Sequence, residues 1–238
     1  MKKILTGALV ALAFVGSVFA LDMKVDAGIS FPISTYSVTQ SYTVLGVTTS
    51  TKYTSTTNDF GLYADADIFF TKLLGLGLNT NFGFPLQTKL SSGDTSTTTK
   101  FGTTENGTKT TAFEFNGLLG CAIRILNSKK MFFIVTPGLD WDIMTTTTAM
   151  SGDNYTSTNK TTCTYFGLGA EAQFGYKVTK NLAISAEVLL AWDFASSGNS
   201  SSSTTVSGRT TSSSTSLDSD NLGKPFIFMP KIGVSYIF

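Results

Sequence analysis

The 238-residue sequence predicts an all-β protein, an eight-stranded antiparallel up-and-down barrel. Three observations support this fold class. Apolar residues occupy every second position in eight separate segments. The links between these segments alternate between short and long. The alternating apolar face carries no charged residue in any segment. The length fits one domain, or at most two.

The alternation has the period of a β-strand, in which successive side chains point to opposite faces. The last segment shows it clearly, since Ile232, Val234, Tyr236 and Phe238 are separated by small or polar residues. The eight segments are residues 21–33, 59–70, 74–86, 112–126, 132–143, 166–178, 182–194 and 226–238. Pro137 and Pro230 fall inside two of them. Because proline cannot donate a ladder hydrogen bond, we expect them to mark β-bulges.

The links predict an up-and-down meander with short turns at one end of the barrel and long connections at the other. Three are short and contain the sequences TKLLG, NSKK and TKN. The other four are rich in Ser and Thr and lie around residues 36–58, 88–111, 145–162 and 195–224. Such sequences bury little apolar surface to offset the entropy of ordering, so we expect four long exposed loops.

The apolar face is predicted to point outward, into lipid. An eight-stranded barrel has an interior only wide enough for side chains of modest bulk. The face opposite the apolar one carries ten glycines, which would relieve crowding in a narrow lumen; only Gly117 lies on the apolar face. Lys or Arg at mid-depth in a bilayer costs about 2–4 kcal/mol, in keeping with the charge-free face. Aromatic residues near both ends of the segments predict two interfacial girdles.

The C-terminal pattern Ile232, Val234, Tyr236 and Phe238 resembles the assembly signal of bacterial outer-membrane barrels. The whole segment 21–238 is similar to the small eight-stranded barrels, a group that includes the transmembrane domain of outer membrane protein A and the Opa-type adhesins. The Ser/Thr-rich links also resemble those of small spirochaetal barrels. The resemblance implies short periplasmic turns, long extracellular loops, an outer-membrane location, and lipid and the barrel-assembly machinery as partners of a monomer.

Residues 1–20 predict a cleaved secretory signal peptide. Two lysines precede an apolar run that ends at Val18-Phe19-Ala20, and the run is short for a membrane helix. The barrel domain would then comprise residues 21–238. Without Lys2 and Lys3 the chain has 15 basic and 16 acidic residues, which argues against a nucleic-acid partner.

Charged residues on the lumen side are the candidate functional residues. The main set is Asp65, Asp67, Glu114, Arg124, Asp140, Asp142, Glu171, Lys177, Glu187 and Lys231, joined by Asp22, Lys24, Asp26, Asp59 and Asp193. They predict either a cation-preferring pore or a plug of salt bridges, and the narrow barrel favours the plug. The pairs Asp65/Asp67 and Asp140/Asp142 are also candidates for acid/base catalysis or cation binding.

Enzyme chemistry and cofactors are not expected. The sequence contains no histidine, so no Ser-His-Asp triad can form, and no Cys/His metal motif is present. The two cysteines, Cys121 and Cys163, are not expected to pair. Two functions remain: surface loops that mediate adhesion or contact with host or neighbouring cells, or a small channel for ions or apolar solutes through the acid-lined lumen.

Overall fold

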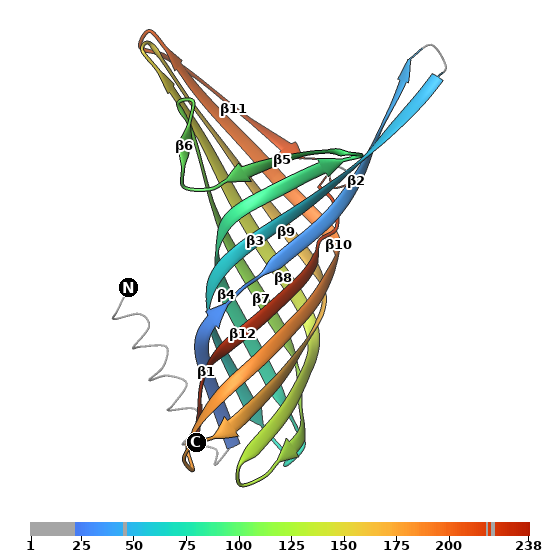
Figure 1. Cartoon of the computed structure of the whole chain (residues 1–238), viewed down its shortest axis with the longest axis vertical. Coiled ribbons are helices and arrows are strands. Elements are labelled where there is room, and N and C mark those ends of the chain that lie inside the picture. Colours follow the sequence, from blue (N-terminus) through green and yellow to red (C-terminus); the bar gives the residue numbers. More distant parts are fainter. Residues whose placement is uncertain (1–21, 45–46, 218, 220–221) are drawn as a thin grey trace.

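The computed structural model describes residues 22–44, 47–217, 219 and 222–238, so the predicted signal peptide lies outside the described residues. The described part is almost entirely β-structure (Figure 1). Its strands are β1 (Asp22–Ser30), β2 (Ile33–Val44), β3 (Val47–Phe69), β4 (Leu74–Ser92), β5 (Thr95–Lys100), β6 (Thr104–Glu105), β7 (Thr108–Asn127), β8 (Met131–Gly152), β9 (Tyr155–Lys177), β10 (Leu182–Val206), β11 (Arg209–Leu217) and β12 (Phe226–Ile237).

Eight of these strands form a closed antiparallel ring. The pairings run from β1 to β3, β4, β7, β8, β9, β10 and β12, and β12 pairs with β1 again. Strand β2 continues β1 after a break at Phe31-Pro32 and pairs with the upper part of β3. The ring satisfies the backbone groups of every barrel strand, as a lipid environment requires. The predicted eight-stranded barrel is therefore confirmed.

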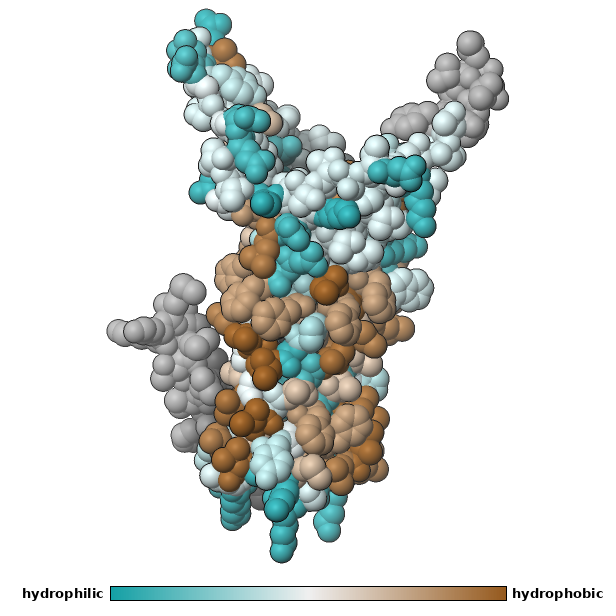
Figure 2. All heavy atoms as spheres, in the orientation of Figure 1, coloured by the Kyte–Doolittle hydropathy of each residue, from teal (hydrophilic) through white to brown (hydrophobic). Residues whose placement is uncertain are grey.

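On the face shown in Figure 2, a band of apolar side chains covers the lower barrel, with polar surface above and below it. Leu62, Ile184 and Phe238 are each at least half exposed. Aromatic pairs such as Phe31–Phe60, 5.9 Å between ring centroids, and Phe84–Phe113, 6.0 Å, pack along its upper border. No helix in the described part of the chain is long and apolar enough to cross a membrane. The outward direction of the apolar face agrees with the prediction.

The four Ser/Thr-rich links are long and largely exposed, as predicted, but they are mostly β-structure and not irregular loops. They extend the barrel strands as antiparallel ribbons (Figure 1) that project beyond the apolar band (Figure 2). The β10–β11 hairpin, for example, pairs continuously from Gly198↔Leu217 to Val206↔Arg209. Thr is a good strand former. The backbone pairing between neighbouring barrel strands also continues directly into the Ser/Thr-rich residues that follow them. Backbone pairing therefore orders these residues without an apolar core.

The predicted bulges lie elsewhere than at Pro137 and Pro230. Pro137 faces Ala170 and Pro230 faces Val188 in unbroken register. The register shifts occur beside Asn58, Arg124 and Asp193. Pro137 instead falls where the β7–β8 ladder has a gap, between Gly120↔Gly138 and Ile123↔Val135. A missing N–H interrupts pairing on one side of a strand without requiring an extra residue.

The three short turns share one hydrogen-bonding arrangement. The hydroxyl oxygens of Thr71, Ser128 and Thr179 accept hydrogen bonds from the backbone N–H groups three residues later, at 2.8, 2.9 and 3.0 Å. In each turn the residue after the hydroxyl is a lysine: Lys72, Lys129 and Lys180. The repeated Ser/Thr-Lys pattern is therefore a turn signal that also places positive charge at this end of the barrel.

Candidate functional site: the lumen and its two mouths

The lumen is filled by alternating layers of apolar and charged side chains. Along β10, Ala183 belongs to a lower apolar cluster, Glu187 to a charged layer, Leu189 and Ala191 to an upper apolar cluster, and Asp193 to a second charged layer. The lower cluster contains Phe69, Ala122, Phe132, Ile134 and Ala183; the upper one contains Leu118, Leu189, Ala191, Ile227 and Met229. The apolar residues on the lumen face are thus true interior residues.

Glycine makes room for the lower apolar cluster. A Cβ atom at Gly175 would lie 2.0 Å from the ring of Phe132, which occupies that space inside the lumen. On the outer wall, the indole of Trp141 similarly covers Gly117, at 2.3 Å from a Cβ position. Each ring therefore lies over the glycine that is its register partner on the neighbouring strand, where a side chain would leave no room for it.

The lower charged layer is an ion-pair network around two lysines. Lys24 pairs with Asp26 and with Asp67, the latter at 2.9 Å. Lys231 pairs with Glu171, with Asp65 at 3.0 Å and with Glu187 at 3.9 Å. Both lysines are almost completely buried. Neutral donors complete the network, since Gln173 donates to Glu187 at 2.6 Å and Tyr63 donates to it at 3.2 Å.

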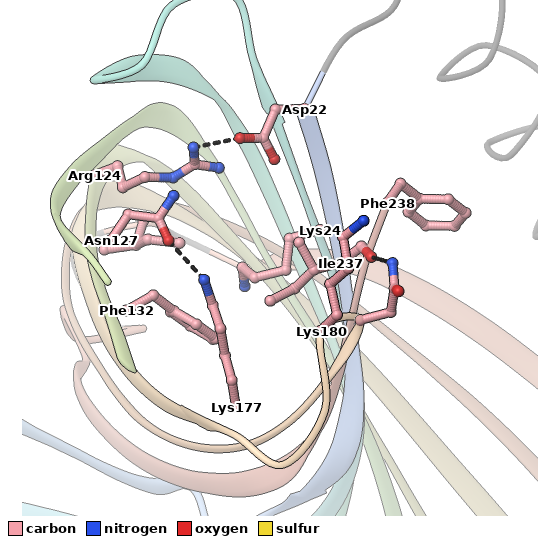
Figure 3. Close-up of a pocket in the computed structure, with 11 residues that line it drawn as sticks. Asp22, Lys24, Arg124, Asn127, Phe132, Lys177, Lys180, Ile237 and Phe238 are labelled. Atoms are coloured by element: carbon pink, nitrogen blue, oxygen red, sulfur yellow. Dashed lines mark hydrogen bonds and ion pairs between the residues drawn. The ribbon is translucent and has the colours of Figure 1, made fainter. Parts of the chain in front are cut away.

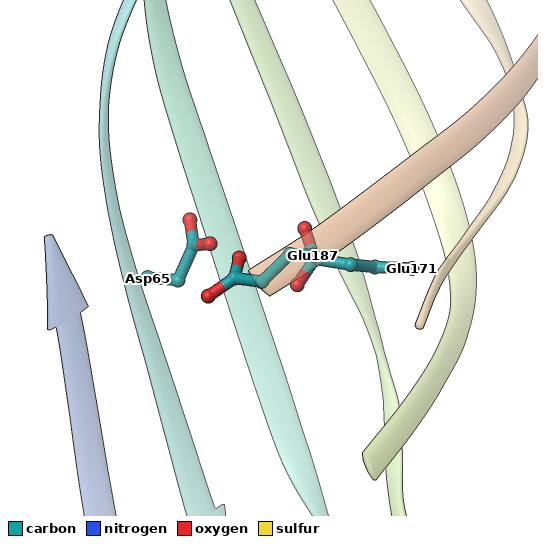
Figure 4. A group of neighbouring side chains, drawn as sticks. All are labelled: Asp65, Glu171 and Glu187. Atoms are coloured by element: carbon teal, nitrogen blue, oxygen red, sulfur yellow. The ribbon is translucent and has the colours of Figure 1, made fainter. Parts of the chain in front are cut away.

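Three carboxylates of this layer are close enough to suggest a metal site. Oxygen atoms of Asp65, Glu171 and Glu187 all lie within 4.8 Å of one another (Figure 4). The ammonium group of Lys231, however, contacts all three. This cation already occupies the position that a metal ion would take, so the group serves as a structural ion-pair centre.

The upper charged layer has five carboxyl groups and, among the described residues, no ion pair: Asp59, Glu114, Asp140, Asp142 and Asp193. Asn116 donates to Asp140 at 3.3 Å. Both oxygens of Asp59 and of Asp193 are buried without a hydrogen-bond donor. Asp59 faces Glu114, and Asp140 faces Asp193, within interaction distance. Two ionised carboxylates can only accept, so each pair needs a proton or a cation between its members.

Above this layer, the extracellular ribbons enclose an open cavity of about 440 Å³. Its wall is hydroxyl-rich, with Tyr36, Thr57, Thr88 and Tyr165 among the lining residues, together with Cys163. Burial raises the pKa of the Cys163 thiol. Cys121 and Cys163 are both free, in agreement with the prediction that they do not pair.

At the periplasmic end, the lumen opens into a pocket of about 390 Å³ (Figure 3). Arg124 pairs with Asp22 at 2.5 Å, and its guanidinium lies 3.6 Å from the centroid of the Phe69 ring. Lys177 donates to the side-chain oxygen of Asn127 at 2.7 Å and to the carbonyl of Ser128 at 2.9 Å. Lys180 also lines this pocket.

The structure divides one of the two acidic pairs that the sequence grouped and keeps the other together. Asp65 binds Lys231 while Asp67 binds Lys24, so the first D-x-D pair is divided between two lysines. Asp140 and Asp142 lie in the upper layer with Glu114. Arg124 and Lys177 lie at the periplasmic mouth, away from both layers. Sequence reasoning missed Tyr63, Gln173 and Asn79, which hydrogen-bond the buried acids; only their place on the lumen face hinted at this role.

The residues of the predicted C-terminal signal all face outward. Ile232, Val234, Tyr236 and Phe238 are each about half exposed, and the last two rings pack at 4.8 Å between centroids. Strand β12 pairs with both β1 and β10, and so closes the barrel. Recognition by an assembly machinery stays a prediction.

Comparison with solved structures agrees with this architecture. The outer membrane protein OprG from Pseudomonas aeruginosa matches with a TM-score of 0.54 at 13% identity, over 92% of this chain and 96% of OprG. A major outer membrane protein from Thermus thermophilus matches with a TM-score of 0.54 at 14% identity, over 89% of this chain and 99% of that protein. This chain has the fold of the small outer-membrane β-barrel proteins. No protein-family model and no curated protein sequence matches it.

The barrel fold and the exposed apolar band together locate the protein in the outer membrane. Since short turns lie on the periplasmic side in bacterial barrels generally, we expect the three short turns on that side and the Ser/Thr-rich ribbons outside the cell.

Proposed function

We propose that the protein is a non-enzymatic barrel that presents Ser/Thr-rich β-ribbons for contact with host or neighbouring surfaces. The observation that carries this proposal is the difference between the packed lumen and the long strand extensions above it. The lumen is closed by packed layers, whereas the strands continue far beyond the apolar band. In β10, residues 195–206 follow the aromatic residues of the band, and at about 3.3 Å per residue they extend roughly 40 Å.

The β9–β10–β11 ribbon offers the most regular of these surfaces. Hydroxyl groups bond across its strands, as between Ser157 and Thr204 at 3.1 Å and between Thr205 and Thr210 at 2.8 Å. Within the described residues its outer strand β11 pairs only with β10, and nearly all of its side chains are exposed. A long edge without proline and with one charge, Arg209, is open to pairing with another strand. An extended polypeptide segment is therefore the class of partner that this edge fits.

The alternative function, a channel for ions or small apolar solutes, needs a continuous path through the lumen. Leu189 and Met229 are completely buried in the upper apolar cluster, and Lys231 is held in its ion-pair network below them. This packing favours a scaffold over a channel.

The test is to replace residues 199–216 by a two-residue Asn-Gly turn, which joins the paired positions Gly198 and Leu217. Cells that express the full chain should attach to surfaces coated with matrix polypeptides, and cells with the shortened ribbon should lose this attachment. A matched variant shortens the β4–β5 hairpin, with residues 89–98 replaced between the paired Thr88 and Thr99. It should attach as the full chain does.

Two results would contradict the proposal. The first is attachment that is unchanged when residues 199–216 are removed. The second is steady single-channel conductance of the purified barrel in planar bilayers, which would support the channel.

A further inference from the structure

The pocket at the periplasmic mouth combines an apolar floor with a polar, basic rim (Figure 3). Phe132 and Ile134 of the lower apolar cluster, with Ile237 packed against it, form the floor. The basic groups come from three different parts of the barrel: Arg124 from β7, Lys177 from the end of β9 and Lys180 from the turn before β10. The closed ring of strands brings them to one opening.

The positive charge of this rim is only partly neutralised. Lys24 also lines the pocket, but its ammonium group is paired with Asp26 and Asp67. Asp22 is the only acidic side chain that lines the pocket among the described residues, and it pairs with Arg124. Lys177 is bonded to neutral oxygens alone, and Lys180 has no acidic partner in the described chain. Three cationic side chains therefore share one side-chain carboxylate.

The donors are also held in place. Stacking on Phe69 fixes the plane of the Arg124 guanidinium, which presents several N–H groups in a rigid fork. The two acceptors of Lys177 direct its ammonium group and leave a third N–H available. The amide of Asn127 stands between these two cations (Figure 3). A fork of N–H groups beside one or two ammonium groups matches the oxygens of a phosphate group.

The surroundings would attract such an anion. Lys72, Lys129 and Lys130 occupy the other two turns at this end, and polar side chains project there below the apolar band (Figure 2). Phe238, which faces outward, also lines the pocket, so the rim borders the apolar outer surface of the barrel. Basic residues near a membrane surface attract anionic headgroups.

We propose that the periplasmic mouth binds a phosphate group, held by Arg124, Lys177 and Lys180. The phosphate belongs either to the headgroup of an anionic phospholipid or to a soluble phosphate compound. This binding is separate from the extracellular ribbons and does not depend on the proposed function.

The experiment uses the full barrel chain refolded in a zwitterionic detergent. Two probes are titrated: inorganic phosphate, and dihexanoyl-phosphatidylglycerol below its micelle concentration. The double variant Lys177→Gln/Lys180→Gln removes two of the pocket cations and should weaken binding about tenfold or more. The matched control Lys89→Gln/Lys100→Gln removes the same charge from the exposed β4–β5 hairpin at the other end of the barrel, and it should change affinity less than about twofold.

Lys180→Gln alone is measured as well, because Lys177 supports a turn and its loss could disturb folding. Lys180 makes no hydrogen bond in the described chain, so this single variant should fold normally and still bind less tightly. Binding of both probes indicates recognition of phosphate itself. Binding of the lipid alone identifies a headgroup site, and binding of inorganic phosphate alone identifies a site for soluble compounds. Binding that does not saturate, or that falls equally in the control, would falsify the proposal.

Discussion

The two charged layers of the lumen contain similar acids but differ in their bases. The lower layer has Lys24 and Lys231 among its carboxylates and lies between two apolar clusters. The upper layer has no lysine or arginine partner in the described chain and lies next to an open cavity. Deep burial of charge is tolerated where it is paired, whereas unpaired acids need access to water, protons or cations. The lower layer is therefore a structural plug, whereas the upper layer is a set of buried acids below the open cavity that need protons or cations between them.

The largest expected effect is the loss of Lys231. In Lys231→Met, the carboxylates of Asp65, Glu171 and Glu187 lose their shared cation while they remain buried. We expect the free energy of unfolding to fall by about 3–5 kcal/mol. Urea unfolding in detergent micelles, followed by the fluorescence of Trp141 and Trp192, measures this change. The control Lys130→Met, on an exposed turn, should leave the midpoint unchanged, and an equal midpoint in both variants would show that the ion pairs do not hold the layer together.

A second, smaller effect is expected from the apolar cluster that separates the two layers. Leu189→Ala removes a completely buried side chain and should cost about 3 kcal/mol. The neighbouring Leu190 faces lipid and is 45% exposed, so Leu190→Ala should cost clearly less. The same unfolding measurement compares the two variants. Equal losses would mean that Leu189 does not separate the layers as its burial indicates.

Replacing one acid in each layer should change stability in opposite directions. Asp142→Asn relieves repulsion among unpaired carboxylates in the upper layer and should stabilise the barrel by about 1 kcal/mol. Asp65→Asn removes a partner of Lys231 from the lower layer and should destabilise the barrel. Urea midpoints at neutral pH measure both changes. If both variants lose stability, the upper acids have partners that the present network does not explain.

The smallest effect concerns the access of a reagent to the extracellular cavity. It changes the reactivity of the Cys163 thiol and leaves the stability of the barrel unchanged. In a Cys121→Ala background, a membrane-impermeant maleimide should label Cys163 on intact cells without prior reduction, because this thiol is free and lines the extracellular cavity. Burial raises the pKa of Cys163, so little thiolate is present at neutral pH. The labelling rate should rise about tenfold per pH unit as the pH is raised from 7 to 8. Labelling only after the outer membrane is opened would reverse the assigned orientation.

Local sequence patterns were sufficient to specify the eight strands, their lipid-facing side and the unequal ends of the barrel. These properties depend on the period of two, the charge-free face and the length of each link. The three turns are also a local feature of the sequence, because in each a Ser or Thr that forms the turn is followed directly by Lys72, Lys129 or Lys180.

Contacts across the lumen depend instead on the three-dimensional arrangement of the strands. Lys231 and Asp65 are separated by 166 positions, and Lys24 and Gln173 by 149, so no local pattern could pair them. Their contacts depend on the strand register and on closure of the ring by β12. The same dependence explains the Ser/Thr-rich ribbons. Their composition predicts exposure, but backbone pairing with a neighbouring strand makes them β-structure. Sequence periodicity thus sets the face on which a side chain lies, whereas register and closure set its partners.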